Sequence, residues 1–134
     1  MYIKWSDELS VGVELIDQQH QEMFDWINRL LRAIGEIGGA ERVVGTADFL
    51  QEYVEKHFAA EEEQMVLHEY TGLAKHKEHH EYFRGQVEAL RKKLAEQGAN
   101  EKLLAEAQEL LVDWFRDHIL KVDMLLGRFL KERT

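Results

Sequence analysis

Five of the chain's seven histidines interrupt apolar stripes of helical spacing, at positions that should face a helical core. They are His20, His57, His76, His80 and His118, and Glu61 follows one turn after His57. Imidazole nitrogens and carboxylate oxygens are typical ligands of transition metals. Burying so many polar groups among Leu and Phe without partners would cost a few kcal/mol each. A shared metal centre would satisfy all of them together.

The spacing of these residues supports this interpretation. His57 and Glu61 lie four residues apart, as do His76 and His80, so each pair points the same way from a helix. The alternative is a set of unrelated core histidines, each hydrogen-bonded to a backbone carbonyl. For a single histidine that alternative is favoured. For five histidines from four segments, one metal centre is the simpler prediction.

Four segments with apolar residues at helical spacing must position these ligands. We predict helices over residues 18–38, 40–67, 72–97 and 100–120, and a short helical segment that ends near 131. The second helix begins near Ala40 or at Thr46, and the sequence leaves both open. Residues 1–17 lack a helical period and predict an extended N-terminal arm. Short connections predict one all-α domain over residues 1–134, an up-down-up-down four-helix bundle.

Composition narrows the class of protein. The chain has no Pro, which suits long helices, and no Cys, which excludes thiolate zinc sites and cysteine-ligated iron–sulfur clusters. A formal net charge of −9 argues against nucleic acid or anionic membranes as partners. We find neither an apolar run long enough to span a bilayer nor the apolar stretch of a signal peptide. These features favour a soluble cytoplasmic protein, which we expect to be a monomer, with an oligomer left open.

Asp123 is a further acidic residue close to this set. It follows His118 by five residues, which on a regular α-helix places it ~140° around the axis. It can join the site only if the helix loosens just past His118 or if the side chain swings back. Taken alone, its position is more typical of a surface aspartate.

The assembled motifs resemble those of the hemerythrins, specifically the small single-domain bacterial members. The similarity runs from Trp5 to about Leu126 and covers the arm and its continuation to His20, His57-x-x-x-Glu61, His76-x-x-x-His80 and His118-x-x-x-x-Asp123. The resemblance implies two iron ions, Fe2+ or Fe3+, with a bridging oxo or hydroxo group. It implies that His76, His80 and His118 hold one iron, that His20 and His57 hold the other, and that Glu61 and Asp123 bridge them.

This ligand set has a functional consequence. Two six-coordinate irons that share five imidazoles, two bridging carboxylates and one bridging oxygen keep a single position open, on the iron of His20 and His57. One open position admits one small ligand, so we predict reversible O2 binding for storage, transport, delivery or scavenging. Nitric oxide and small anions such as azide are further candidate ligands. By resemblance, the pocket residues would be Met23, Phe58, Trp114, Ile119 and Leu120, each of which also suits ordinary bundle core.

Two other classes of function use the same site. One is a sensor of O2, redox state or nitric oxide, and the other is a peroxidase-like di-iron enzyme. The chain lacks the Glu-x-x-His motifs of carboxylate-rich di-iron enzymes, and neutral imidazoles disfavour high oxidation states, so we expect a binding protein and not an enzyme. His-Glu-x-x-His is absent too, which disfavours a zinc hydrolase. The remaining histidines and acids near these motifs are expected at helix ends, in solvent or pointing elsewhere: His68, His79, Glu62, Glu63 and Asp117.

Overall fold

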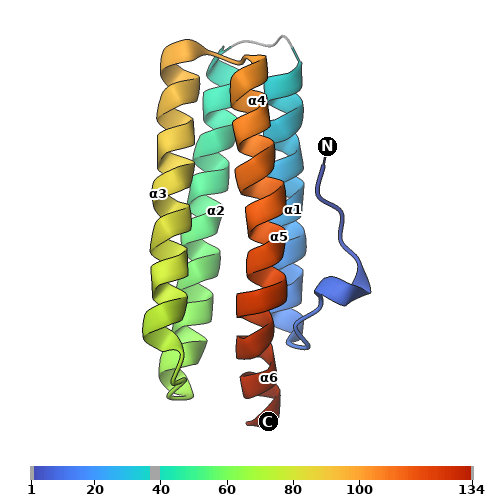
Figure 1. Ribbon diagram of the computed structural model, residues 1–134, viewed down its shortest axis with the longest axis vertical. Helices are drawn as coiled ribbons and strands as arrows, with labels where there is room; N and C mark the ends of the chain where they lie inside the picture. The colour runs from blue at the N-terminus through green and yellow to red at the C-terminus, as the bar shows by residue number, and fades with distance from the viewer. Residues whose placement is uncertain (1, 37–39, 134) are drawn as a thin grey trace.

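The computed structural model describes residues 2–36 and 40–133, which form an up-down-up-down bundle of helical rods with an N-terminal arm on the outside (Figure 1). The first three rods are α1 (Glu14–Gly35), α2 (Ala40–Leu67) and α3 (Leu73–Gln97). The fourth rod begins with α4 (Glu101–Gln108), which contacts both α1 and α3 and so closes the bundle. The predicted four-helix bundle is confirmed.

The fourth rod stays helical from Glu101 to Glu132 but changes its winding along the way. After α4 come the π-helical η2 (Glu109–Trp114), α5 (Phe115–His118), the π-helical η3 (Ile119–Asp123) and α6 (Met124–Glu132). The predicted helix over about 100–120 and the short helical segment that ends near 131 are thus joined in one continuous rod. No Gly or Pro between His118 and Leu126 ends the helix, and it continues through the π-helical η3.

The ends of α1 differ from the prediction as well. The helix begins at Glu14, not at 18, because Ile16 lies one turn before His20 on the same buried face. It ends at Gly35, before the predicted 38, and Gly38 and Gly39 lie outside the described residues. At the second helix, the structure places the start at Ala40.

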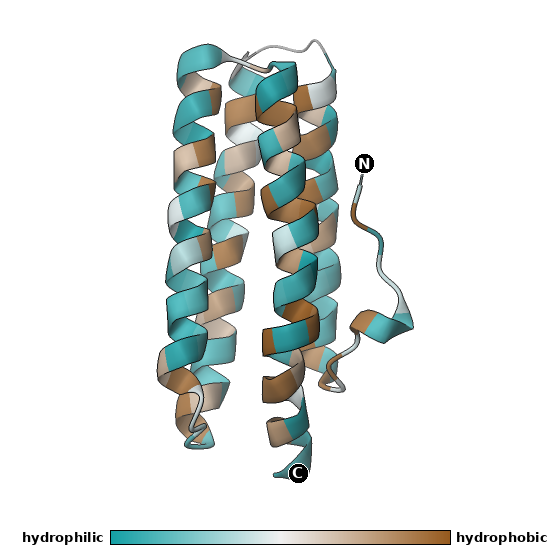
Figure 2. Ribbon diagram, viewed as in Figure 1, coloured by the Kyte–Doolittle hydropathy of each residue, from teal (hydrophilic) through white to brown (hydrophobic). Residues whose placement is uncertain are grey.

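The apolar positions of the four rods form one continuous core. Along each rod, apolar and polar segments alternate (Figure 2), as expected for helices with one buried face. The largest fully buried side chains include Phe58, Phe83, Phe115, Leu50 and Met65. Within residues 2–36 and 40–133, no helix combines the length and apolar character needed to cross a membrane.

The N-terminal arm is fastened to the bundle at several points. Ile3 exchanges two hydrogen bonds with the side chain of Asn28, at 3.0 and 2.8 Å. Nearer α1, the Asp17 carboxylate accepts from Ser10 Oγ at 2.5 Å and from Val11 N at 2.8 Å. Ile3 and Val11 are buried, as is Leu9 in the 3-10 turn η1 (Asp7–Leu9), so the arm extends the core over the outer side of α1.

The arm also crosses α6 where a side chain would not fit. A Cβ atom added at Gly127 would lie 2.1 Å from the carbonyl oxygen of Val11 and 2.8 Å from Val11 Cβ. Gly127 therefore allows close contact between the arm and the last turns of the fourth rod.

We expect Gly127→Ala to lower the free energy of unfolding by ~1–3 kcal/mol, because the new methyl group must push Val11 away. Urea denaturation measures the change. Gly85→Ala is the matched control: a Cβ there meets nothing within 4 Å, and Gly85 is an exposed position inside α3. That variant should gain about 0.5–1 kcal/mol. Equal effects of the two substitutions would contradict a close approach at Gly127.

Candidate metal centre

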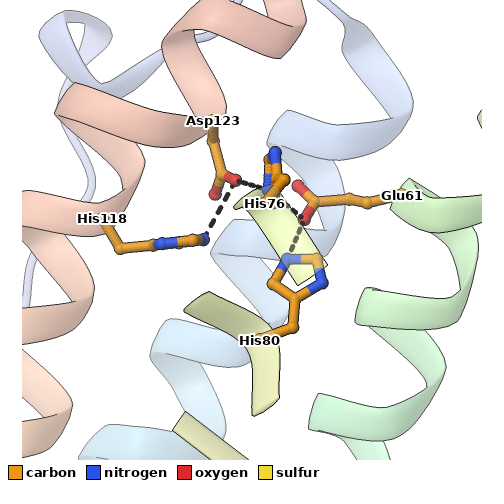
Figure 3. A group of neighbouring side chains, drawn as sticks. All are labelled: Glu61, His76, His80, His118 and Asp123. Atoms are coloured by element: carbon orange, nitrogen blue, oxygen red, sulfur yellow. Dashed lines mark hydrogen bonds and ion pairs between the residues drawn. The ribbon is translucent and has the colours of Figure 1, made fainter. Parts of the chain in front are cut away.

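All seven candidate ligands predicted from the sequence meet inside the bundle. Each of the four rods contributes, and every one of these side chains is 3% exposed or less. They form two overlapping groups whose ligand atoms lie within 4.8 Å of one another. The larger group contains Glu61, His76, His80, His118 and Asp123 (Figure 3), and the smaller contains His20, His57, Glu61 and Asp123.

The two carboxylates stand between the two sets of histidines. Asp123 Oδ1 lies 2.9 Å from His76 Nε2 and 3.1 Å from His118 Nε2, whereas Oδ2 lies 3.0 Å from His20 Nε2.

The two carboxylate oxygens of Glu61 are directed to the two sets of histidines in the same way. Its Oε1 lies 3.1 Å from His80 Nε2, and its Oε2 lies 3.3 Å from His57 Nε2. Each carboxylate therefore turns one oxygen towards the three-histidine set and the other oxygen towards the two-histidine set.

The π-helical segment η3 brings Asp123 into the cluster. The Met124 N–H bonds to the carbonyl of Ile119, five residues back, which is the hydrogen bond of a π-turn. Five residues then make roughly one turn, so Asp123 returns to the face of His118 and does not lie ~140° away as on an α-helix. The loosened helix that the sequence required for this residue is present.

The outer ring nitrogens show which tautomer two of the histidines adopt. His57 Nδ1 lies 2.8 Å from the amide oxygen of Gln19, and His80 Nδ1 lies 2.8 Å from Glu62 Oε2. Both oxygens accept, so each Nδ1 donates. In the neutral ring, the Nε2 lone pair is then directed into the cluster, as a metal ligand requires.

The interior of the cluster is rich in acceptors that lack donors. Among the described residues, the buried atoms without a hydrogen-bond partner include Nε2 of His20, His57, His76 and His118, Glu61 Oε2 and both oxygens of Asp123. Buried polar atoms are normally paired, so a group of this size indicates a missing positive charge. The donor set, imidazole nitrogens with shared carboxylates, fits a pair of iron-class cations.

The electrostatics of the cluster show the same need for positive charge. Burial by itself lowers the pKa of His20, yet the close carboxylates of Asp123 and Glu61 outweigh burial and raise it to about 9. His76 behaves alike, and its pKa also rises to about 9. Without a cation, protons on these rings balance the carboxylates, and a bound metal would displace them.

The two carboxylates remain charged in this setting. Burial raises the pKa of Glu61, but attraction to His57 and the close imidazoles of His20 and His76 hold it well below its usual range. Burial and the nearby Glu61 also raise the pKa of Asp123, and His118 and His20 reverse that effect. By contrast, burial lowers the pKa of His57.

Aromatic rings pack around the histidines. Phe58 stacks on His80 with ring centres 3.7 Å apart, and Trp114 stacks on His118 at 5.1 Å. Phe115, which the sequence did not single out, meets His20 edge-on at 5.8 Å. Of the residues expected to line a pocket, Met23, Phe58 and Ile119 are fully buried, and Trp114 and Leu120 are half-buried. Their role in a ligand pocket stays a prediction.

Three residues lie closer to the cluster than the sequence suggested. Glu62 was expected to point elsewhere, but it accepts from His80 because it lies on the α2 face next to α3. His79 was expected in solvent, but it is half-buried with its ring 5.8 Å from that of His118. Gln19, which accepts from His57, is absent from the predicted site as well. The one available signal was that a metal-bound histidine needs a partner for its outer nitrogen.

Comparison with known proteins agrees with this geometry. The family model described as "Hemerythrin HHE cation binding domain" matches residues 11–130. The chain belongs to this hemerythrin family. Its homologues and fold support a non-haem iron protein that binds O2.

Individual relatives cover nearly the whole chain. The bacteriohemerythrin of Clostridium acetobutylicum is 30% identical over 89% of this chain and 94% of its own length. The myohemerythrin of Sipunculus nudus is 25% identical over 89% of this chain and 86% of its own length. The crystal structure of a wild-type hemerythrin superposes with a TM-score of 0.83 at 31% identity, covering 97% of this chain and 98% of the other.

The raised pKa values of His20 and His76 predict how the metal-free chain responds to pH. A folded-state pKa of about 9, above the ordinary 6.5, gives stability that is fully present below pH 6.5 and is lost as the pH rises to about 9. Each group contributes on the order of 3 kcal/mol at most. Thermal melts of chelator-treated protein should therefore show Tm falling across this window, and His76→Gln should flatten the fall. A constant or rising Tm would contradict this assignment.

Proposed function

We propose that this chain holds two iron ions on the seven clustered side chains and binds O2 reversibly at one of them. His76, His80 and His118 would hold one iron, His20 and His57 the other, and Glu61 and Asp123 would bridge them. The observation that carries this proposal is the division of both carboxylates, with one oxygen directed to each set of histidines.

The two-histidine side is where we infer that O2 binds. With a bridging oxo or hydroxo group, three imidazoles would complete one six-coordinate iron, and two imidazoles would leave one position open on the other. When bound, the iron pair would supply the electrons for O2 binding. The chain supplies a dry setting, because the ligands are buried and Phe58 and Phe115 pack against them.

We infer that binding, and not turnover, is the activity. Five neutral imidazoles and only two carboxylates give less negative charge than the ligand sets of carboxylate-rich di-iron enzymes, so high iron oxidation states are less stable here. On the side of His20 and His57, where we place the open position, the fully buried rings of Phe115 and Phe58 pack against the histidines, which suits a small ligand such as O2, nitric oxide or azide.

Anaerobic reconstitution with ferrous iron tests the proposal directly. We expect two irons per chain and a visible charge-transfer band that appears in air and disappears under argon over repeated cycles. His118→Ala should lose iron, because it removes a ligand and leaves a cavity beside Asp123. His68→Ala is the control, since His68 belongs to neither ligand group, and it should retain both irons. A single metal per wild-type chain, or a band that never reverses, would refute the proposal.

Leu120 tests whether apolar packing protects the centre. It is half-buried in η3 and packs against the core. We expect Leu120→Ser to speed autoxidation by about tenfold, equivalent to ~1.4 kcal/mol in the barrier, because a hydroxyl draws water and protons inward. Leu104→Ser, the same change at a half-buried position of α4, should leave the rate unaltered. Equal autoxidation rates in the two variants would contradict a role for Leu120 in the ligand pocket.

A further inference from the structure

His57 and His80 each have a hydrogen-bond partner at Nδ1, the ring nitrogen that faces away from the cluster. The two partners differ in charge. His80 Nδ1 donates to the carboxylate of Glu62, and His57 Nδ1 donates to the neutral amide of Gln19, each at 2.8 Å. Among the described residues, the Nδ1 atoms of His20, His76 and His118 have no such partner. The one charged outer acceptor therefore lies on the three-histidine side of the cluster.

Glu62 is held in this position by Arg84. The guanidinium Nη2 lies 3.6 Å from Glu62 Oε2, and the side chains of both residues are about one-fifth exposed, at 20% and 19%. Arg84 is itself fixed by Glu55, which accepts from Nε at 2.8 Å, and by Glu81, which accepts from Nη1 at 2.5 Å.

A ring stack completes the same arrangement. The Arg84 guanidinium lies 5.3 Å from the centre of the Phe58 ring, and that ring stacks on His80 at 3.7 Å with an interplanar angle of 5°. His80 is thus fixed by Glu62 at its outer nitrogen and by Phe58 on one face. Neither contact involves an atom that would ligate a metal.

A charged acceptor changes what a histidine donates to a metal. A carboxylate pulls on the Nδ1 proton more strongly than an amide does, because hydrogen bonds to ionised groups are about twice as strong as neutral ones. The ring then carries more negative charge at Nε2 and becomes a stronger ligand, with a larger benefit for Fe3+ than for Fe2+.

We propose that Glu62, acting through His80, biases the iron pair so that the metal on the three-histidine side is the more easily oxidised of the two. This inference rests on the proposed function, since it needs an iron pair to bias. Gln19 leaves His57 without the same charge, so the side with the open position keeps a higher reduction potential. Glu62 is a positioning and tuning residue, not a ligand.

The test compares Glu62→Gln with Glu63→Gln in the full-length, iron-loaded chain. Both variants lose one negative charge, at adjacent positions of α2, but Glu63 is exposed. Spectroelectrochemical titration should show the lower of the two potentials rising in Glu62→Gln by about 59 mV, a tenfold change for one electron. In the same variant, competition with a chelator for Zn2+, a redox-inert probe, should show affinity reduced by about 10- to 100-fold. Glu63→Gln should match the wild type in both.

An exchanged pair of residues gives a second, independent measurement. In the double variant Gln19→Glu with Glu62→Gln, net charge is conserved but the carboxylate moves to His57. The gap between the two potentials should narrow relative to the wild type. A gap equal to that of the wild type would contradict an effect of the outer partner.

The outcomes separate this inference from the proposed function. If wild type binds two irons and Glu62→Gln equals Glu63→Gln in potential and in affinity, Glu62 does not tune the centre and the proposed function stands. If wild type does not bind two irons, the proposed function fails, and this inference fails with it. Circular dichroism of each variant verifies that the helices are intact.

Discussion

Imidazole nitrogens and carboxylate oxygens direct their lone pairs into one buried space, and that convergence requires positive charge. Protons on His20 and His76, whose pKa values lie near 9, provide the charge when no cation is bound. A pair of metal ions provides it better, because a metal accepts several lone pairs whereas a proton is held by one or two atoms. The buried imidazole nitrogens and carboxylate oxygens are costly to leave unpaired in the folded chain. The same atoms therefore favour the binding of metal ions.

The rods of the bundle bring these nitrogen and oxygen atoms together in different ways. α2 and α3 each place two ligands one turn apart, which an ordinary α-helix does without distortion. The fourth rod must place His118 and Asp123 on one face although they are five residues apart, so it widens into η3. Such π-turns are rare and occur often at functional sites, because their poorer hydrogen bonding is offset by the ligand that they bring into place. The N-terminal arm packs against Gly127 in α6, the helix that follows η3.

Much of the site could be predicted from the sequence, for a physical reason. The pairs His57–Glu61 and His76–His80 follow the helical repeat, so a local rule places them on one face. Asp123 violates that repeat, and only the resemblance to hemerythrins identified it as a candidate ligand. Glu62 could not be identified, because its partner His80 lies on a neighbouring helix and one sequence does not give the register between helices. The early start of α1 follows the same local rule, because Ile16 lies one turn before the buried His20.

The two sides of the cluster differ in two respects that act in the same direction. One side has three imidazoles, and one of these is hydrogen-bonded to the charged Glu62. The other has two imidazoles, and the known outer partner is the neutral Gln19. The additional imidazole and the carboxylate of Glu62 both stabilise positive charge on the three-histidine side. The two-histidine side has fewer imidazoles and only a neutral outer acceptor. In the proposed centre, a small molecule that draws electron density would bind where coordination is incomplete, and the positive charge left behind would be stabilised best on the three-histidine side. In the proposed di-iron centre, the asymmetry that would leave a position open on the two-histidine side would also favour oxidation of the metal on the three-histidine side.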